Sequence, residues 1–354
     1  MNTNIRTNFK PIAIGSFPYR TPGKALEKIF EYYREIPLWP QLPRKSALEQ
    51  MYIQYTENMP GINYNSETGK LTAREPDDEF FIEMGDMLEK AMAEEVEPFA
   101  ISASRASGFH EFLSQEKKIK DLKPDFVKGH VTGPISFGLN VTDINMKPLL
   151  YDDSYKEIIT QTLTMKALWQ GYRLANPGFK TIIFVDEPYL ANIGSSMVAI
   201  SETEATNILS EMITILKKKG FITGVHCCGN TDWAILFNSG CTIISADIYE
   251  YGDNFLLYAD EIVRFINNGG IIAWGMVPTS PEAEEVTMEN LESRLEKYLN
   301  KLAEKGLNRK TLLNQSLVSG SCGMGNLSPQ LAETVMKKNR LFSDYIRNKY
   351  NFNS

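Results

Sequence analysis

The chain has 354 residues, 43% hydrophobic and 23% charged, which is ordinary for a globular protein that buries its own core. Its 37 basic and 44 acidic residues give a formal net charge of −7, so nucleic acid and anionic membranes are not expected partners. No apolar run reaches the roughly 18 residues of a membrane span, and the polar start MNTNIRTNFK does not resemble a signal peptide. We expect a cytoplasmic protein.

Short apolar runs alternate with helical patterns along most of the chain. The runs predict strands at 11–17, 126–131, 181–186, 221–227, 242–247, 271–276 and 314–319. The helical patterns cover 21–36, 154–175, 202–219, 231–239, 256–268, 283–305 and 328–348. This alternation predicts βαβ units and a parallel sheet. With an eighth strand within residues 37–105, for which 96–102 is the best candidate, it favours a (β/α)8 TIM barrel over an open doubly wound sheet.

The segment at about 45–95 interrupts this alternation. It is polar and rich in turn residues, as in GINYNSETGKLTAREPDDEFF. We interpret it as an N-terminal insertion or cap over one face of the barrel. No linker or internal repeat divides the chain, so residues 1–354 are predicted to form a single TIM-barrel domain.

Polar and titratable residues follow the predicted strands. In barrels of this class, catalytic residues lie at the carboxyl ends of the strands. The residues found at those ends are Ser16 after the first strand, Asp186 and Glu187 in DEP, the HCCGN run at 226–230, Asp247, and Cys322 in SGSCGMG. They are therefore the candidate site.

The HCCGN run contains two side chains suited to a metal. His226 and Cys228 lie two residues apart, so in an extended strand end they point to the same side, and Cys227 points to the other. Cys322 ends the last strand and lies on the same rim. A histidine and two cysteines around one point suit Zn²⁺. We therefore predict a zinc site, with Cys227 as a packing residue.

The fourth metal ligand is open between two carboxylates. Asp247 ends the sixth strand and has the better position, whereas Glu250 would reach the metal from a loop. We favour Asp247, as a replaceable ligand that would leave a place for substrate. The remaining cysteine, Cys241, precedes a strand and is expected to be structural.

Four motifs in order carry a resemblance to a known superfamily. IGSFP at 14–18, VDEP at 185–188 and SCGMG at 321–325 resemble the catalytic barrel of cobalamin-independent methionine synthase. HCCGN at 226–230 resembles the HxCGN of zinc enzymes that transfer methyl groups from corrinoid proteins to thiols. The same superfamily includes uroporphyrinogen decarboxylase. The resemblance of this chain to the superfamily also implies a TIM barrel.

The resemblance implies a zinc-dependent methyltransferase that activates a small-molecule thiol as a zinc thiolate and methylates it. Homocysteine is one candidate acceptor, giving methionine, and another thioether product stays open. This chain has room for one barrel, whereas the folate-using synthases have two, so we expect a methylcorrinoid donor, free or on a corrinoid protein. By resemblance, Asp186 holds the substrate ammonium and Ser16 helps position it, with Asp186 and Glu187 as the catalytic carboxylate pair.

Two other functions stay open from the sequence. A metal-free decarboxylase like uroporphyrinogen decarboxylase would have strongly basic strand ends. A non-catalytic zinc- or corrinoid-binding protein would hold its metal in a closed site with four protein ligands. The acidic DEP motif and Asp247 disfavour the decarboxylase.

Overall fold

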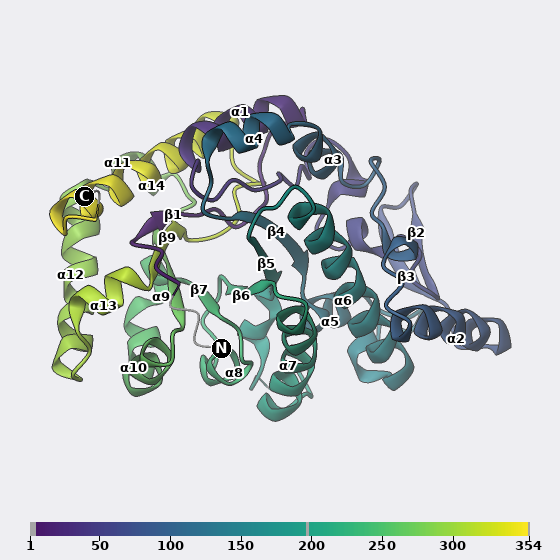
Figure 1. Cartoon of the computed structure of the whole chain (residues 1–354). Coiled ribbons are helices and arrows are strands. Elements are labelled where there is room, and N and C mark those ends of the chain that lie inside the picture. Colours follow the sequence, from purple (N-terminus) through teal and green to yellow (C-terminus); the bar gives the residue numbers. More distant parts are fainter. Residues whose placement is uncertain (1–4, 196–197, 353–354) are drawn as a thin grey trace.

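A curled parallel sheet of seven strands forms the centre of the molecule, with helices packed around its outside (Figure 1). The structure is a computed structural model and describes residues 5–195 and 198–352. The strand order is β1-β9-β8-β7-β6-β5-β4. The strands are β1 (Lys10–Pro11), β4 (Val127–Thr132), β5 (Thr181–Asp186), β6 (Ile222–Cys227), β7 (Ile243–Asp247), β8 (Ile271–Val277) and β9 (Ser316–Gly320).

The helices follow the predicted alternation with the strands. They are α1 (Pro22–Tyr32), α2 (Asp78–Met92), α3 (Ser107–Ser114), α4 (Glu116–Leu122), α5 (Pro134–Asn140), α6 (Asp153–Ala175), α7 (Glu202–Lys218), α8 (Ala234–Asn238), α9 (Ile248–Phe255), α10 (Ala259–Asn267), α11 (Glu282–Glu285), α12 (Met288–Glu304), α13 (Arg309–Asn314) and α14 (Pro329–Lys349). The predicted helix at 283–305 is divided into α11 and α12. In the part of the chain that the structure describes, no helix is long and apolar enough to cross a membrane.

The prediction of an eighth strand at 96–102 is wrong. Glu97–Phe99 forms a 3-10 helix, with Pro98 in its first turn. Residues 37–41 lie between the two edges of the sheet instead, where Leu38 bridges Lys128 of β4 and Gln41 bridges Ser16. The sequence of this segment, PLWPQ, has a proline at every third position, and proline cannot donate to a ladder. Isolated bridges therefore replace a regular strand.

The first strand is shorter than predicted. The strand β1 consists of Lys10 and Pro11, so it contains one residue of the run at 11–17, and Ile12 makes a last backbone hydrogen bond to Val318 of β9. Ser16 pairs with Gln41 instead. The fold is thus a curled, TIM-barrel-like parallel sheet in which segment 37–41 joins the edges.

Side chains alternate between two apolar layers along the strands. The inward residues at the amino ends form a separate buried cluster, which we call the floor: Ile12, Ile36, Phe126, Ile182, Phe184, Ile243, Ile271, Ala273 and Leu317. The alternate residues, such as Val185 and Ile244, pack outward against the helices. This period of two is what a parallel strand buried on both faces requires.

The polar segment near the N-terminus forms a hairpin and a helix. The hairpin consists of β2 (Ile62–Asn65) and β3 (Lys70–Ala73), and α2 follows it. Figure 1 shows both projecting to the right of the sheet, and Thr72 bridges Thr142 after α5. That 45–95 is an insertion within a single domain stays a prediction.

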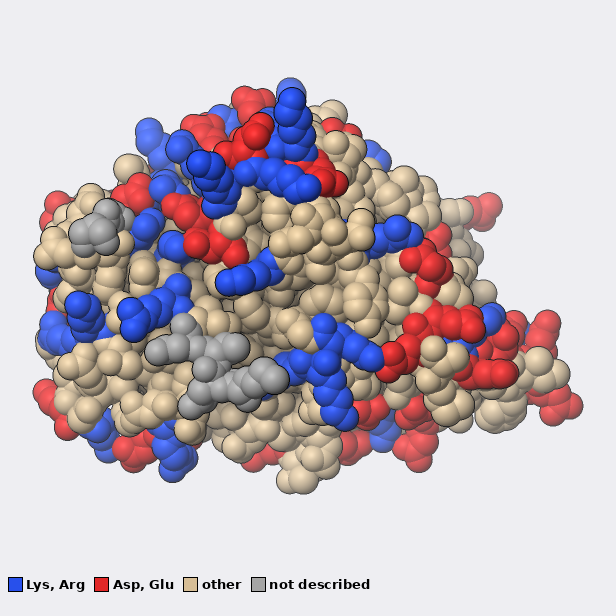
Figure 2. All heavy atoms as spheres, in the orientation of Figure 1, with Lys and Arg blue, Asp and Glu red and all other residues tan. Residues whose placement is uncertain are grey.

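Basic and acidic side chains are interspersed on the face drawn in Figure 2, and acidic ones are dense on the side where α2 projects. The segment 75–97 contains ten aspartates and glutamates against one lysine. The prediction that nucleic acid is not a partner is untested.

Candidate metal centre

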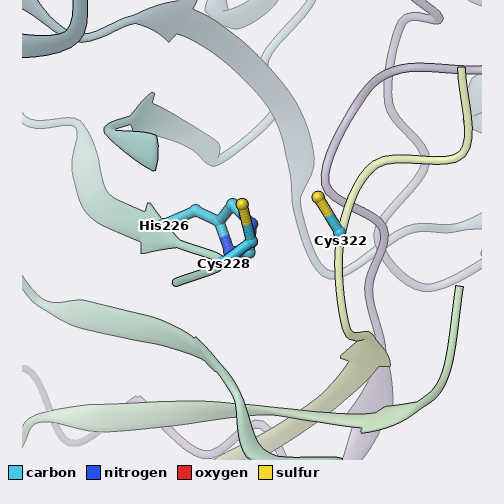
Figure 3. A group of neighbouring side chains, drawn as sticks. All are labelled: His226, Cys228 and Cys322. Carbon is cyan, nitrogen blue, oxygen red and sulfur yellow. The ribbon is translucent and has the colours of Figure 1, made fainter. Parts of the chain in front are cut away.

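One histidine and two cysteines converge at the carboxyl ends of the strands, as predicted. His226 lies near the end of β6, Cys228 follows that strand, and Cys322 lies in the loop after β9 (Figure 3). Their ligand atoms all lie within 4.8 Å of one another, with His226 buried and both cysteines half-buried. Around a tetrahedral zinc, ligand atoms would be about 3.5–4 Å apart, so small side-chain rotations would complete the geometry.

The imidazole of His226 is already oriented for a metal. Its Nδ1 lies 3.0 Å from Oγ of Ser245, and its Nε2 has no hydrogen-bond partner within the described residues. Buried polar atoms are normally paired, so this free Nε2 is available to bind a metal. The sequence did not identify Ser245, because its place beside His226 depends on the register of β6 and β7.

The two thiols interact with each other. The adjacent thiol of Cys228 lowers the pKa of Cys322, and His226 contributes to this shift. The same interaction, together with burial, raises the pKa of Cys228 above its usual range. A bound cation would be held by the two sulfur atoms as thiolates.

The other two cysteines are packing residues, as predicted. Cys227 is fully buried in the outer core, and its thiol is 3.6 Å from the carbonyl of Gly229. Cys241 is buried and donates to the carbonyl of Leu236 at 3.7 Å. Burial raises the pKa of Cys227 to about 12 and that of Cys241 to about 11, so both stay as neutral thiols.

The predicted fourth ligand, Asp247, lies at the end of β7. Its Oδ1 accepts the backbone N–H of Glu250 at 3.0 Å and so caps α9. Burial raises the pKa of Asp247 to about 7, and the hydrogen bond from Glu250 opposes this shift. Asp247 is not part of the three-residue group described above. Ligation by Asp247 or Glu250 stays a prediction.

Asp186 ends β5 next to His226 in the register of the sheet. Its Oδ1 is buried and has no hydrogen-bond partner within the described residues. Burial raises the pKa of Asp186 to about 6, and the nearby charge of Lys128 opposes the shift. The unpaired oxygen of Asp186 is therefore available to a cationic group.

Glu187 points away from Asp186 and stabilises a helix. Its two carboxylate oxygens accept the backbone N–H groups of Ile135 (3.0 Å) and Ser136 (2.7 Å) at the N-terminus of α5. A Cβ at Gly133 would lie 2.1 Å from this carboxylate. The two carboxylates therefore do not act as a facing pair, and a catalytic role for Glu187 stays untested.

A cavity of about 880 Å³ opens above the three donors. Asp186, His226, Cys228, Cys322 and Ser16 all line it, so every predicted site residue except Glu187 and Asp247 reaches its wall. The outer wall includes apolar residues of the hairpin and of the loop after α5, Leu71, Ile144 and Met146 among them. Three protein donors beside a cavity leave one metal position open, as in catalytic zinc sites.

Comparison with solved structures supports this fold. No protein-family model and no curated protein sequence matches the chain. A B12-independent methionine synthase from Shewanella sp. W3-18-1, solved with selenomethionine, matches with a TM-score of 0.56 over 97% of this chain and 99% of that one. The chain has the fold of a B12-independent methionine synthase. The sequences are 12% identical, so the similarity shows the fold alone.

A second solved structure has a related description. It is a putative vitamin-B12 independent methionine synthase from Listeria monocytogenes, 13% identical, covering 96% of this chain and 98% of that one. Its TM-score of 0.48 is too low to carry an argument. The methionine-synthase fold and the three-donor group are both in agreement with the resemblance in the sequence motifs.

Proposed function

We propose that this protein is a zinc-dependent methyltransferase that activates a small thiol and methylates it, with homocysteine as a candidate acceptor and a methylcorrinoid as donor. The observation that carries the proposal is the free Nε2 of buried His226 beside the thiols of Cys228 and Cys322, at the wall of a large cavity. The methionine-synthase fold supports the reaction class.

The residues fit zinc by their chemistry. His226 would bind as neutral imidazole, held in that tautomer by Ser245, and the two cysteines would bind as thiolates. When bound, zinc would lower the pKa of a substrate thiol in its open position and so supply a nucleophilic sulfur at neutral pH.

Asp186 and Ser16 are proposed to bind the substrate. The unpaired carboxylate of Asp186 would accept the ammonium group of an amino-acid thiol. Ser16 lies on the wall of the same cavity next to the Cys322 loop, where its hydroxyl or backbone would hold the other end of the substrate. Both contacts would orient the thiol toward the three donors.

The alternatives receive less support. Among the described residues that line the cavity, Arg44 and Lys70 are balanced by Asp143 and Asp186, so the strand ends lack the basic character that a tetrapyrrole carboxylate would need. A closed structural zinc site would need a fourth protein donor. The three-donor group with an adjoining cavity favours an open metal position.

Metal analysis of the purified protein tests the proposal. We expect about one zinc per chain in the wild type, and less than a tenth of that in His226→Ala and Cys322→Ser. Cys241→Ser is the matched control, because it removes a buried thiol outside the site, and it should keep its zinc. A wild type without stoichiometric zinc, or site variants that retain it, would contradict the proposal.

X-ray absorption at the zinc edge tests the open position. Adding homocysteine should replace one oxygen or nitrogen neighbour by sulfur. If several thiols leave the spectrum unchanged, the closed-site alternative is correct. The methyl donor is tested separately by single-turnover methyl transfer from methylcobalamin or from a methylated folate. Transfer from the folate and not from methylcobalamin would show that the donor is a folate and not a corrinoid.

A further inference from the structure

A lysine is buried inside the curled sheet without an acidic partner in contact. Lys128 lies on β4 and is fully buried, and no carboxylate of the described residues lies within ion-pair distance of its ammonium. The ammonium donates to the backbone carbonyl of Ile14 and lies 4.4 Å from the ring centroid of Phe184. Burying a charge is costly, so this side chain calls for an explanation that packing does not give.

The hydrogen bond from Lys128 to Ile14 spans the gap between the two edge strands of the sheet, β4 and β1. Between β4 and β1 there is no strand ladder, and segment 37–41 joins them through isolated bridges. The turn at residues 14–16 is bonded to this segment instead, because Gly15 accepts the N–H of Gln41 at 2.9 Å and Phe17 donates to the carbonyl of Gln41 at 2.9 Å. Lys128 reaches from β4 across the interior and holds this turn by its carbonyl.

A second residue of β4 holds the same turn. His130 lies two positions after Lys128 on the same strand face, and its ring stacks on Trp39 with centroids 4.0 Å apart. A Cβ at Gly15 would come within 2.7 Å of the His130 ring, so the turn packs directly on it. Lys128 and His130 thus both contact the turn that carries Ser16.

Ser16 in turn holds the loop of the metal ligand Cys322. Its backbone carbonyl accepts the N–H of Met324 at 2.9 Å. Its side chain lies between two glycines of this loop, since an added Cβ would be 3.2 Å from Ser16 Cβ at Gly323 and 2.1 Å from Ser16 Oγ at Gly325. Cys322 directly precedes this contact.

We infer that Lys128 is a positioning residue of the metal centre, which acts through the Ile14 carbonyl and the 14–16 turn to hold Cys322 against His226 and Cys228. The inference rests on the proposed metal site. It also explains why a lysine is buried at this position. Its ammonium can donate a hydrogen bond to the Ile14 carbonyl across the gap between β4 and β1, and an apolar side chain of the same length cannot.

Lys128→Met tests the inference, with Lys166→Met as the matched control. Lys166 is also a fully buried lysine bonded to backbone carbonyls, but its partner is Glu57 at 2.7 Å, outside the 14–16 turn. We expect the dissociation constant for Co²⁺, measured by its thiolate charge-transfer band, to rise about tenfold in Lys128→Met and to stay unchanged in Lys166→Met. The midpoint of urea unfolding of the metal-free protein should not fall in Lys128→Met, because an apolar isostere replaces a buried charge. A wild-type Co²⁺ affinity in Lys128→Met overturns the inference.

Gly325→Ala disturbs the same contact from the other side. It should weaken Co²⁺ binding by a similar factor, because its methyl group collides with Ser16. If both variants act on one contact, the double variant should lose less than the product of the two single losses. Losses that multiply would show independent effects and overturn the inference.

Hydrogen exchange of the metal-free proteins separates this inference from the proposed function. Peptides covering residues 320–327 should exchange faster in Lys128→Met than in the wild type or in Lys166→Met. A wild type that binds no metal would end the proposed function, while the exchange result would still report whether Lys128 holds the loop. Unchanged exchange would overturn the positioning role even if the wild type binds zinc.

Discussion

Three inward residues of one strand, β7, show the contrast between the two ends of the sheet. Ile243 is fully buried in the apolar floor, Ser245 contacts His226 of the candidate metal centre, and Asp247 ends the strand. The floor consists of apolar residues throughout. At the other end, which we call the rim, several buried polar atoms have no hydrogen-bond partner among residues 5–195 and 198–352: those of His130, Thr132, Asp186, His226 and Ser319.

This difference separates stability from function along the same strands. Unpaired buried polar atoms cost free energy of folding, and the rim carries several of them. The floor, whose own side chains are all apolar, offsets that cost. Substitutions in the floor should therefore change the free energy of unfolding, whereas substitutions at the rim should change ligand binding.

The largest expected effect on stability comes from the floor. Ile243→Ala removes buried methyl groups and leaves a cavity, so we expect a loss of about 2–5 kcal/mol in the free energy of unfolding. Urea unfolding of the metal-free protein measures it. The zinc affinity of the folded protein should not change, and Ile243→Val should lose roughly 1 kcal/mol. If Ile243→Ala weakens zinc binding tenfold while the protein stays folded, then the floor affects metal binding as well as stability, and the proposed separation is wrong.

Two positions further along the same strand, the expected effect is on metal binding. Ser245→Ala frees Nδ1 of His226 and should weaken zinc binding about 10- to 100-fold. A competition titration with a chelating dye measures the dissociation constant. Ser239→Ala is the control, because Ser239 is also buried and bonded, to the carbonyl of Leu236, but has no contact with His226. Equal zinc affinities of Ser245→Ala and Ser239→Ala would show that Ser245 does not orient His226 for metal binding.

Much of the rim could be predicted from the sequence. Alternation along β6 was enough to separate Cys228 from Cys227, because the spacing of two residues fixes their sides. The convergence of Cys322 followed from the strand order, since parallel strands present their carboxyl ends on one edge. Ser245 was missed because side-by-side contacts depend on register between strands that are joined by a helix, which the sequence does not encode locally.

The errors in the fold and in the site have physical causes as well. The run at 96–102 is apolar, but Pro98 favours the first turn of a 3-10 helix, and the place of the eighth strand is taken by the proline-rich segment 37–41. Glu187 follows Asp186 directly, so strand-end position alone could not show that its carboxylate caps α5.

Carboxylates at the two ends of the sheet differ in whether they have an ion-pair partner. At the floor end, Glu35 precedes Ile36 and is paired with Arg340 at 2.6 Å and Arg347 at 3.4 Å. Burial opposes its ionisation, but the hydrogen bond and charge of Arg340 outweigh burial and lower the pKa of Glu35. At the rim, burial raises the pKa of Asp186, which lacks such a pair.

The smallest expected effect is therefore a pH-dependent one at the floor end. Because the pKa of Glu35 is lower in the folded than in the unfolded protein, the unfolded state binds more protons and ionised Glu35 stabilises the fold. That stability should be fully present above the unfolded value of about 4.3 and lost as pH falls through the folded value. Glu35→Gln should thus lose about 1 kcal/mol at pH 7 relative to the wild type, and the two proteins should converge toward pH 3. Urea unfolding at both pH values measures this difference in the free energy of unfolding.

The control is Glu31→Gln, which removes a carboxylate paired at the surface with Lys28 and should differ little from the wild type at either pH. A gap between wild type and Glu35→Gln that is the same at pH 3 and pH 7 would mean that packing of the side chain, and not its ion pairs, stabilises this end of the sheet.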